Sequence, residues 1–155
     1  MADLVIRPAS TDDVPRLTEV FQAARTAAMP WLPVLHTPEE DLAFFGRNVA
    51  ERDCTVAVLE ARVVGFAVVH EGDLDHLYLD PALRRRGYGT ALLAHVRSRQ
   101  EGPLQLWAFT ANVAAREFYA ACGAVELFET DGSGNEEKTP DVRLELPAWD
   151  EPGHA

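Results

Sequence analysis

Residues 77–93 read Leu-Tyr-Leu-Asp-Pro-Ala-Leu-Arg-Arg-Arg-Gly-Tyr-Gly-Thr-Ala-Leu-Leu, and this stretch decides the fold. Pro81 ends a strand because its ring cannot donate to a ladder, and the apolar residues at the end of the stretch continue with helical spacing. Gly87 and Gly89 leave the backbone between strand and helix open, and the helix start adds unpaired N–H groups and the positive end of its dipole. Flexible positive charge for outer phosphates comes from three consecutive residues: Arg84, Arg85 and Arg86. The segment therefore predicts a phosphate-binding loop.

Two other kinds of phosphate loop do not fit this sequence. A P-loop ends in Gly-Lys followed by Ser or Thr, and the chain contains no Gly-Lys pair. The dinucleotide fingerprint needs a third glycine near position 92, which is Leu92. The remaining alternative is a glycine-rich turn with solvated arginines.

The charge of the whole chain is opposite to that of the loop. Its 14 basic and 25 acidic residues give a formal net charge of −11, which argues against general binding to nucleic acid or to an anionic membrane. No apolar run is long enough to span a bilayer, and the N-terminus lacks the pattern of a secretion signal. Cys54 and Cys122 have no second ligand at metal spacing, so no metal site is expected. We expect a cytoplasmic protein, and the acidity suits a cationic small substrate.

The order of elements predicts one domain over residues 1–147 followed by a flexible tail over 148–155. Apolar spacing gives the order β-α-α-β-β-β-α-β-α-β-β, which indicates an α+β fold in three layers. Its mixed, mostly antiparallel sheet has six or seven strands and is flanked by about four helices. In a regular strand over 74–79, Leu77 and Leu79 would share a face and Leu74 would lie on the opposite one. A bulge near Asp75 and His76 would bring all three to the same face. The expected elements are strands over 4–7, 55–59, 63–70, 74–79, 103–109, 125–129 and 142–146, and helices over 14–29, from 38, over 91–99 and over 112–122.

Two helix starts carry capping-box patterns. Ser10 precedes Asp13 by three residues, and Thr37 precedes Glu40 by three with a proline between them. The second of these helices is expected to place Leu42, Phe45 and Val49 on its apolar side.

At this point the chain resembles the GNAT superfamily of N-acetyltransferases over residues 4–146, most specifically over 74–123. Residues 77–93 look like its acyl-CoA motif, Arg/Gln-x-x-Gly-x-Gly/Ala after a bulged strand. The resemblance implies the GNAT fold and acetyl-CoA as cofactor. Backbone amides of the loop would hold its pyrophosphate, and the strand before the loop would pair with its pantetheine arm. The implied cofactor-binding residues are Leu77, Tyr78, Leu79, Arg84, Arg85, Arg86, Gly87, Tyr88, Gly89 and Thr90.

A second motif of the family matches at residues 112–123, Asn-Val-Ala-Ala-Arg-Glu-Phe-Tyr-Ala-Ala-Cys-Gly. The resemblance implies that Asn112 contacts the cofactor and that Tyr119 is the general acid and also lies at the cofactor. Two helical turns separate them, so both project from one face. A phenol is neutral at pH 7 and can reprotonate a leaving thiolate. Arg116 could reach a phosphate or solvent; the alternative for Tyr119 is an aromatic residue that only packs.

The sequence does not decide which group deprotonates the acceptor. His76 has the most suitable ordinary pKa and is our first candidate for a catalytic base, although a strand histidine is equally often a surface residue. Asp73 and Glu71 lie on or just before the same strand, and His36 lies in an apolar loop. Water is the remaining alternative. A backbone N–H beside the bulge could hold the thioester oxygen.

The acceptor-binding residues are expected in three places. The apolar segment 31–36 contains Trp31 and His36 and could line a pocket or only plug the core. Trp107 stands where members that acetylate ribosomal-protein N-termini have a catalytic glutamate, which argues against that substrate and suggests a flat apolar wall. Residues 136 and 137 are both Glu and could attract a cationic amine or solvate a hairpin tip.

The leading hypothesis is an enzyme that moves acetyl from acetyl-CoA to a primary amine by direct attack in a ternary complex. The expected partner is a small-molecule or peptide amine, neither nucleic acid nor membrane is expected, and a homodimer stays open. The alternative is a GNAT-fold module that binds or senses acyl-CoA without turnover.

Overall fold

A seven-stranded sheet forms the middle layer of this computed structural model, which describes residues 3–150. Its strand order is β1-β2-β3-β4-β5-β7-β6, and all neighbours are antiparallel except β4 and β5, which are parallel. The expected mixed, mostly antiparallel sheet is therefore confirmed. The strands are β1 (Leu4–Pro8), β2 (Asp53–Leu59), β3 (Arg62–His70), β4 (Asp73–Leu79), β5 (Leu104–Phe109), β6 (Val125–Thr130) and β7 (Asp141–Leu146).

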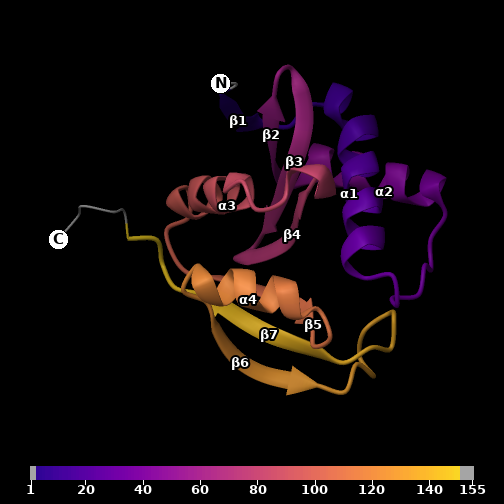
Figure 1. The fold of residues 1–155 in the computed structure, drawn as a ribbon, viewed down its shortest axis with the longest axis vertical. Helices are drawn as coiled ribbons and strands as arrows, with labels where there is room; N and C mark the ends of the chain where they lie inside the picture. Colours follow the sequence, from indigo (N-terminus) through magenta and orange to yellow (C-terminus); the bar gives the residue numbers. More distant parts are fainter. Residues whose placement is uncertain (1–2, 151–155) are drawn as a thin grey trace.

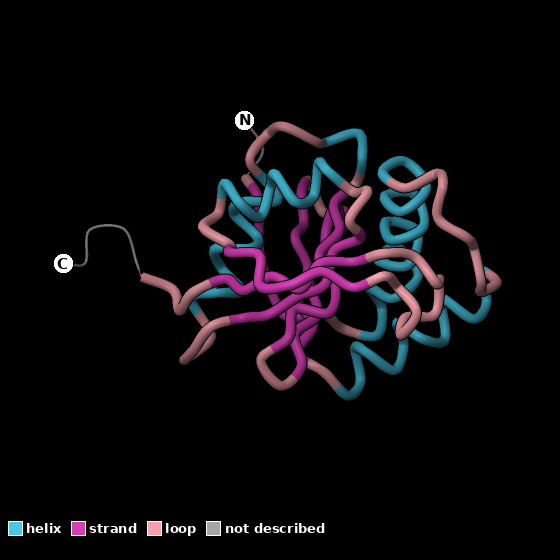
Figure 2. Tube along the Cα trace, turned by 90° about the horizontal axis from the view of Figure 1, so that it is seen from below, coloured by secondary structure: helices cyan, strands magenta, loops and turns pink. Residues whose placement is uncertain are grey.

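Helices cover both faces of the sheet (Figures 1 and 2). On one face, α1 (Val14–Ala28) and α2 (Pro38–Glu51) pack over β2 and β3 around Phe45 and Phe66, which are fully buried. On the other face, α3 (Tyr88–Ser98) and α4 (Val113–Ala121) pack on the second apolar core. The predicted three-layer order of elements is confirmed, with short 3₁₀ turns added before α1 and α3.

Both predicted capping boxes form. The Ser10 backbone N–H donates to Asp13 at 2.8 Å, and the Thr37 and Glu40 side chains accept from each other's backbone N–H at 3.1 and 3.0 Å. The predicted apolar side of α2 is wrong at Leu42, which is 43% exposed. Instead Asn48, one turn after Phe45, is buried, because its amide donates to the carbonyl of the preceding turn and needs no water.

The predicted bulge in β4 is present. Val68 on β3 pairs with His76, but the next residue, Val69, pairs with Leu74. Asp75 is therefore the extra residue, and it puts Leu74 in the same apolar core as Leu77. The bulge explains why these leucines, three positions apart, lie on one face of the sheet.

The strands β4 and β5 meet at one end and diverge at the other. Their parallel pairing consists of Asp73 with Gln105, and the Gln105 N–H donates to the carbonyl of Gly72 at 3.0 Å. Arg143 on β7 fixes this junction, since its guanidinium donates to Asp73 at 2.7 Å and to Gln105 at 3.1 Å. Beyond this point the sheet opens toward Leu79.

Residues 147–150 follow β7 without regular structure, and Trp149 lies under Arg97 at 5.1 Å from guanidinium carbon to ring centre. The rest of the expected tail, 151–155, lies outside the described residues. Within residues 3–150, every helix is too short or too polar to cross a bilayer.

Leu92 on α3 is fully buried in the core beneath the site. We expect Leu92→Ala to lower the free energy of unfolding by about 3 kcal/mol, because it leaves a cavity. Leu42→Ala, at an exposed helix position, is the control and should cost no more than about 0.5 kcal/mol. Urea denaturation measures both, and equal losses would contradict the assigned burial.

Candidate functional site

A groove of about 600 Å³ opens where β4 and β5 diverge. The C-terminal half of α1, the loop before α3 and one face of α4 complete its walls. The groove brings together eleven residues that the sequence pointed to: Leu77, Tyr78, Leu79, Arg84, Arg85, Gly87, Tyr88, Gly89, Thr90, Asn112 and Tyr119.

The loop before α3 has the backbone shape of an anion cradle. Arg85 and Gly87 have left-handed φ values of 65° and 83°, which turn successive N–H groups toward one side. The α3 helix begins after Gly87 without a side-chain cap, so the first N–H groups of the helix are free to bind an anion at the positive end of the dipole. The donors, the local charge and the adjoining groove fit the pyrophosphate of coenzyme A. Arg86 is exposed and does not line the groove.

The α4 side of the groove presents Asn112, at the start of the helix, and Tyr119. The Asn112 side chain caps α4 by accepting from the Ala115 N–H at 3.2 Å. The Tyr119 side chain is buried, and burial, together with Tyr78, raises the pKa of its phenol above the ordinary value of 10. The phenol is therefore protonated at neutral pH and can act only as a proton donor there. Phe118 packs 3.6 Å from the position of a Cβ on Gly89, which sets α4 against the start of α3.

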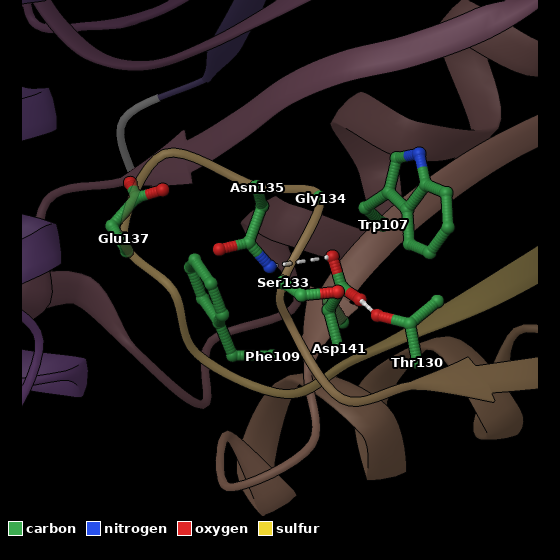
Figure 3. Close-up of a pocket in the computed structure, with 9 residues that line it drawn as sticks. Trp107, Phe109, Thr130, Ser133, Gly134, Asn135, Glu137 and Asp141 are labelled. Carbon is green, nitrogen blue, oxygen red and sulfur yellow. Dashed lines mark hydrogen bonds between the residues drawn. The ribbon is translucent and has the colours of Figure 1, made fainter.

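A second cavity of about 590 Å³ lies against β5 and the loop between β6 and β7 (Figure 3). Trp107 and Phe109 supply its aromatic walls. Asp141 is buried and holds the loop in shape, since it binds the Thr130 hydroxyl and accepts from the Asn135 amide at 3.1 Å. The cavity therefore has flat aromatic walls and a polar rim that hydrogen bonds hold in place.

The loop between β6 and β7 also binds the segment that follows α1 (Figure 1). His36 lies 2.7 Å from Glu136 and 3.7 Å from Glu40. Partial loss of water opposes protonation, but the two carboxylates outweigh it and raise the pKa of His36 above 6.5. This link between the loops therefore weakens as the pH rises through the raised pKa. Trp31 adds an edge-to-face contact with Phe109 at 6.2 Å.

Comparison with known proteins agrees with this geometry. Residues 50–123 match the family described as Acetyltransferase (GNAT) domain. They belong to the GNAT family. The structure of YjaB from Escherichia coli superposes with a TM-score of 0.78 at 22% identity, covering 93% of this chain and 97% of that one. PaiA N-acetyltransferase from Thermoplasma acidophilum in complex with coenzyme A superposes with a TM-score of 0.75 at 16% identity, covering 94% and 99%. These likenesses extend the GNAT fold to nearly the whole chain.

Among curated proteins, mycothiol acetyltransferase from Clavibacter sepedonicus is 39% identical over 92 residues. The match covers 55% of this chain and 30% of that protein, so the chain spans under a third of its relative's length.

Arg116, which the sequence suggested could reach a phosphate or solvent, is held by β6 in this structure. Its guanidinium binds Glu126 through two nitrogens at 2.7 and 2.9 Å and donates to the Thr110 carbonyl at 3.0 Å. Glu129 lies 3.8 Å away. Two carboxylates on β6 thus occupy this arginine, and the sequence spacing within α4 alone gave no sign of them.

His76, the first candidate for the catalytic base, lies in a cluster of aromatic rings. Its ring lies among Phe21, Phe44, Phe45 and Tyr78 at centre distances of 5.2–6.3 Å. It lines neither cavity, and its Nδ1 is buried without a partner among the described residues. Burial, with a smaller contribution from Arg52, lowers its pKa to about 4. The aromatic surroundings therefore make it a weak base, and its predicted catalytic role finds no support in this position.

The two acidic candidates on the same hairpin have other positions. Asp73 pairs with Arg143 at 2.7 Å and fixes the strand junction. Glu71 is 83% exposed at the turn before β4. Neither lines the groove or the second cavity. Trp107 does line the second cavity, while His36 and Trp31 hold the neighbouring loops.

Sequence reasoning missed Phe109 and the Asp141 network. Alternation along β5 could have found Phe109, since it shares a face with Trp107. No local signal pointed to Asp141, because its partners lie at the start and in the middle of the loop, 11 and 6 residues before it.

The lowered pKa of His76 makes stability depend on pH. Between about pH 6.5 and 4 the unfolded chain protonates this ring while the folded chain does not, so stability is lost as the pH falls. We expect His76→Phe to gain stability over the wild type as the pH falls through this range, by on the order of 3 kcal/mol in total. Urea denaturation at several pH values measures this difference, with His70→Phe at an exposed position as control. A difference that stays constant with pH would contradict the assignment.

Proposed function

We propose that this GNAT domain is an N-acetyltransferase that moves acetyl from acetyl-CoA to a primary amine by direct attack in a ternary complex. The observation that carries the proposal is the single groove whose lining combines an anion cradle with a buried phenol. The names of the curated relative and of the coenzyme A complex support the same chemistry. The reaction would belong to the cytoplasm.

Binding follows from the shape of the groove. The loop over 84–90 would hold the pyrophosphate through its free N–H groups, and the edge of β4 would pair with the amides of the pantetheine arm. Among residues 3–150, Asp73 is the position of that edge that pairs with β5, so the backbone groups further along toward Leu79 have no β5 partner there. One such N–H beside the bulge would hold the thioester oxygen.

Bound acetyl-CoA supplies an acetyl group activated as a thioester. The nitrogen of an unprotonated amine forms the C–N bond as the C–S bond breaks. Tyr119 then gives its proton to the leaving sulfur and is reprotonated by the proton that the nitrogen loses. A proton released before attack, when the acceptor arrives as ammonium, goes to water. The buried phenol favours this enzyme over the alternative of a module that binds acyl-CoA without turnover, since a binder needs no acid.

The cradle is tested by Gly89→Trp. A Cβ at Gly89 meets only the Phe118 ring at 3.6 Å, so the domain should fold while the indole fills the groove. We expect retention on immobilised coenzyme A to be lost. Gly102→Trp is the matched control, because a Cβ there meets nothing within 4 Å and the position lies outside the groove. Equal retention of both variants would reject the groove as the cofactor site.

The acid is tested by Tyr119→Phe, which removes only a hydroxyl. We expect kcat to fall at least about 100-fold, with the Kd for coenzyme A and the melting temperature nearly unchanged. Thiol release from acetyl-CoA in the presence of an amine panel measures turnover. If thiol release stays intact, Tyr119 only packs; if the wild type releases no thiol with any amine, the binding module is the better description.

A further inference from the structure

We infer that Glu137 receives the ammonium group of the acceptor, and that the acceptor is a primary amine carried on a flat or apolar body. This inference rests on the proposed function, because it names the substrate class of the same site. The second cavity, the charges around it and its junction with the groove each contribute to it.

The cavity has two kinds of wall. Trp107, 48% exposed, and Phe109 present aromatic surface on β5. In Figure 3 the two rings stand on opposite sides of the fixed Asp141 network, and Glu137 lies beyond Phe109 at the outer edge. Flat rings beside a carboxylate are complementary to an ammonium joined to an apolar body, since the body covers the rings and the charge meets the carboxylate.

Most carboxylates around the cavity already have close partners. Asp141 binds Thr130 and Asn135, and Glu136 pairs with His36 at 2.7 Å. These groups hold the loop and have little capacity left for a ligand.

Glu137 differs from them. Its side chain is 21% exposed, and within residues 3–150 its ionic neighbour is Arg25, with Nη2 at 3.9 Å. That distance is too long for a hydrogen bond, and the same Nη2 donates to the Pro33 carbonyl at 2.6 Å. Lys138, the next residue, donates to the Ser133 carbonyl at 2.9 Å and stays within its own loop. The Glu137 carboxylate is therefore left able to accept hydrogen bonds from a ligand.

Glu137 also lies next to the donor groove, because its neighbour Arg25 is on α1, whose residues Ala24, Ala27 and Ala28 line that groove. Its charge acts on Tyr78, which lines that groove, and it contributes to raising the pKa of Tyr78 to about 12, mainly through burial. Tyr78 acts in turn on Tyr119. An amine held at Glu137 would therefore lie beside the α1 wall of the groove in which the thioester is proposed to bind.

The test compares two ligands and three proteins by calorimetry with coenzyme A present. The ligands are 2-phenylethylamine, which has the ring and the ammonium, and 2-phenylethanol, which has the ring alone. The proteins are the wild type, Glu137→Gln and the control Glu129→Gln. Glu129 is an exposed carboxylate on β6 that lines neither cavity, so its substitution removes the same charge elsewhere.

We expect the wild type and Glu129→Gln to bind the amine at least about 10-fold more tightly than the alcohol, and Glu137→Gln to bind the two alike, because a hydrogen bond to a charged group is lost. The KM for the amine should rise by a similar factor while the KM for acetyl-CoA stays the same. No preference for the amine in the wild type, or the same preference in Glu137→Gln, would overturn the inference. If the amine binds in a Glu137-dependent way but no thiol is released, the amine site at Glu137 is supported and the proposed transferase activity is contradicted.

Discussion

The site depends on the contacts that Arg143 makes with two neighbouring strands. It reaches from β7 to Asp73 on β4 and Gln105 on β5, with its side chain 12% exposed and its guanidinium carbon 5.1 Å from the centre of the Trp107 ring. The clamp closes the two halves of the sheet at one end, so the strands can diverge only toward the other. Divergence exposes the edge of β4, and this exposed edge forms the floor of the groove. One arginine thus links the donor groove with the aromatic wall of the second cavity.

The two cavities also differ in whether backbone or side chains form them. The donor groove is formed largely by backbone: a bulge, left-handed turns and an uncapped helix start. Backbone features of this kind suit a ligand whose phosphates and amides are the same in every reaction. The second cavity is formed by side chains from distant segments that meet through ion pairs and the Asp141 network. Such contacts change with single substitutions, so this side can be adapted to one acceptor.

The roles of His76 and Arg116 are both set by side chains that contact them in the fold. His76 and Arg116 have the chemistry that the sequence reasoning asked for, but their neighbours decide what that chemistry does. Four aromatic rings surround His76 and deny its charged form water, while Glu126 occupies Arg116. Except for Tyr78, two residues after His76 on β4, these partners lie on other elements, so residue type alone did not indicate what surrounds either side chain.

The sequence by itself determined the order of elements, both capping boxes, the β4 bulge and the open glycine loop between β4 and α3. Each depends on spacing within about ten residues, where glycine, proline and apolar periodicity act directly on the backbone. It also put Asn112 and Tyr119 on one helix face. Only the tertiary structure decided which acidic groups have close partners: Asp73 is bound by a residue 70 positions away, whereas Glu137, within residues 3–150, has only a 3.9 Å contact with Arg25 beside the aromatic wall. The physical reason is that burial and pairing are properties of neighbours in space, and the chain brings those neighbours together only when the sheet forms.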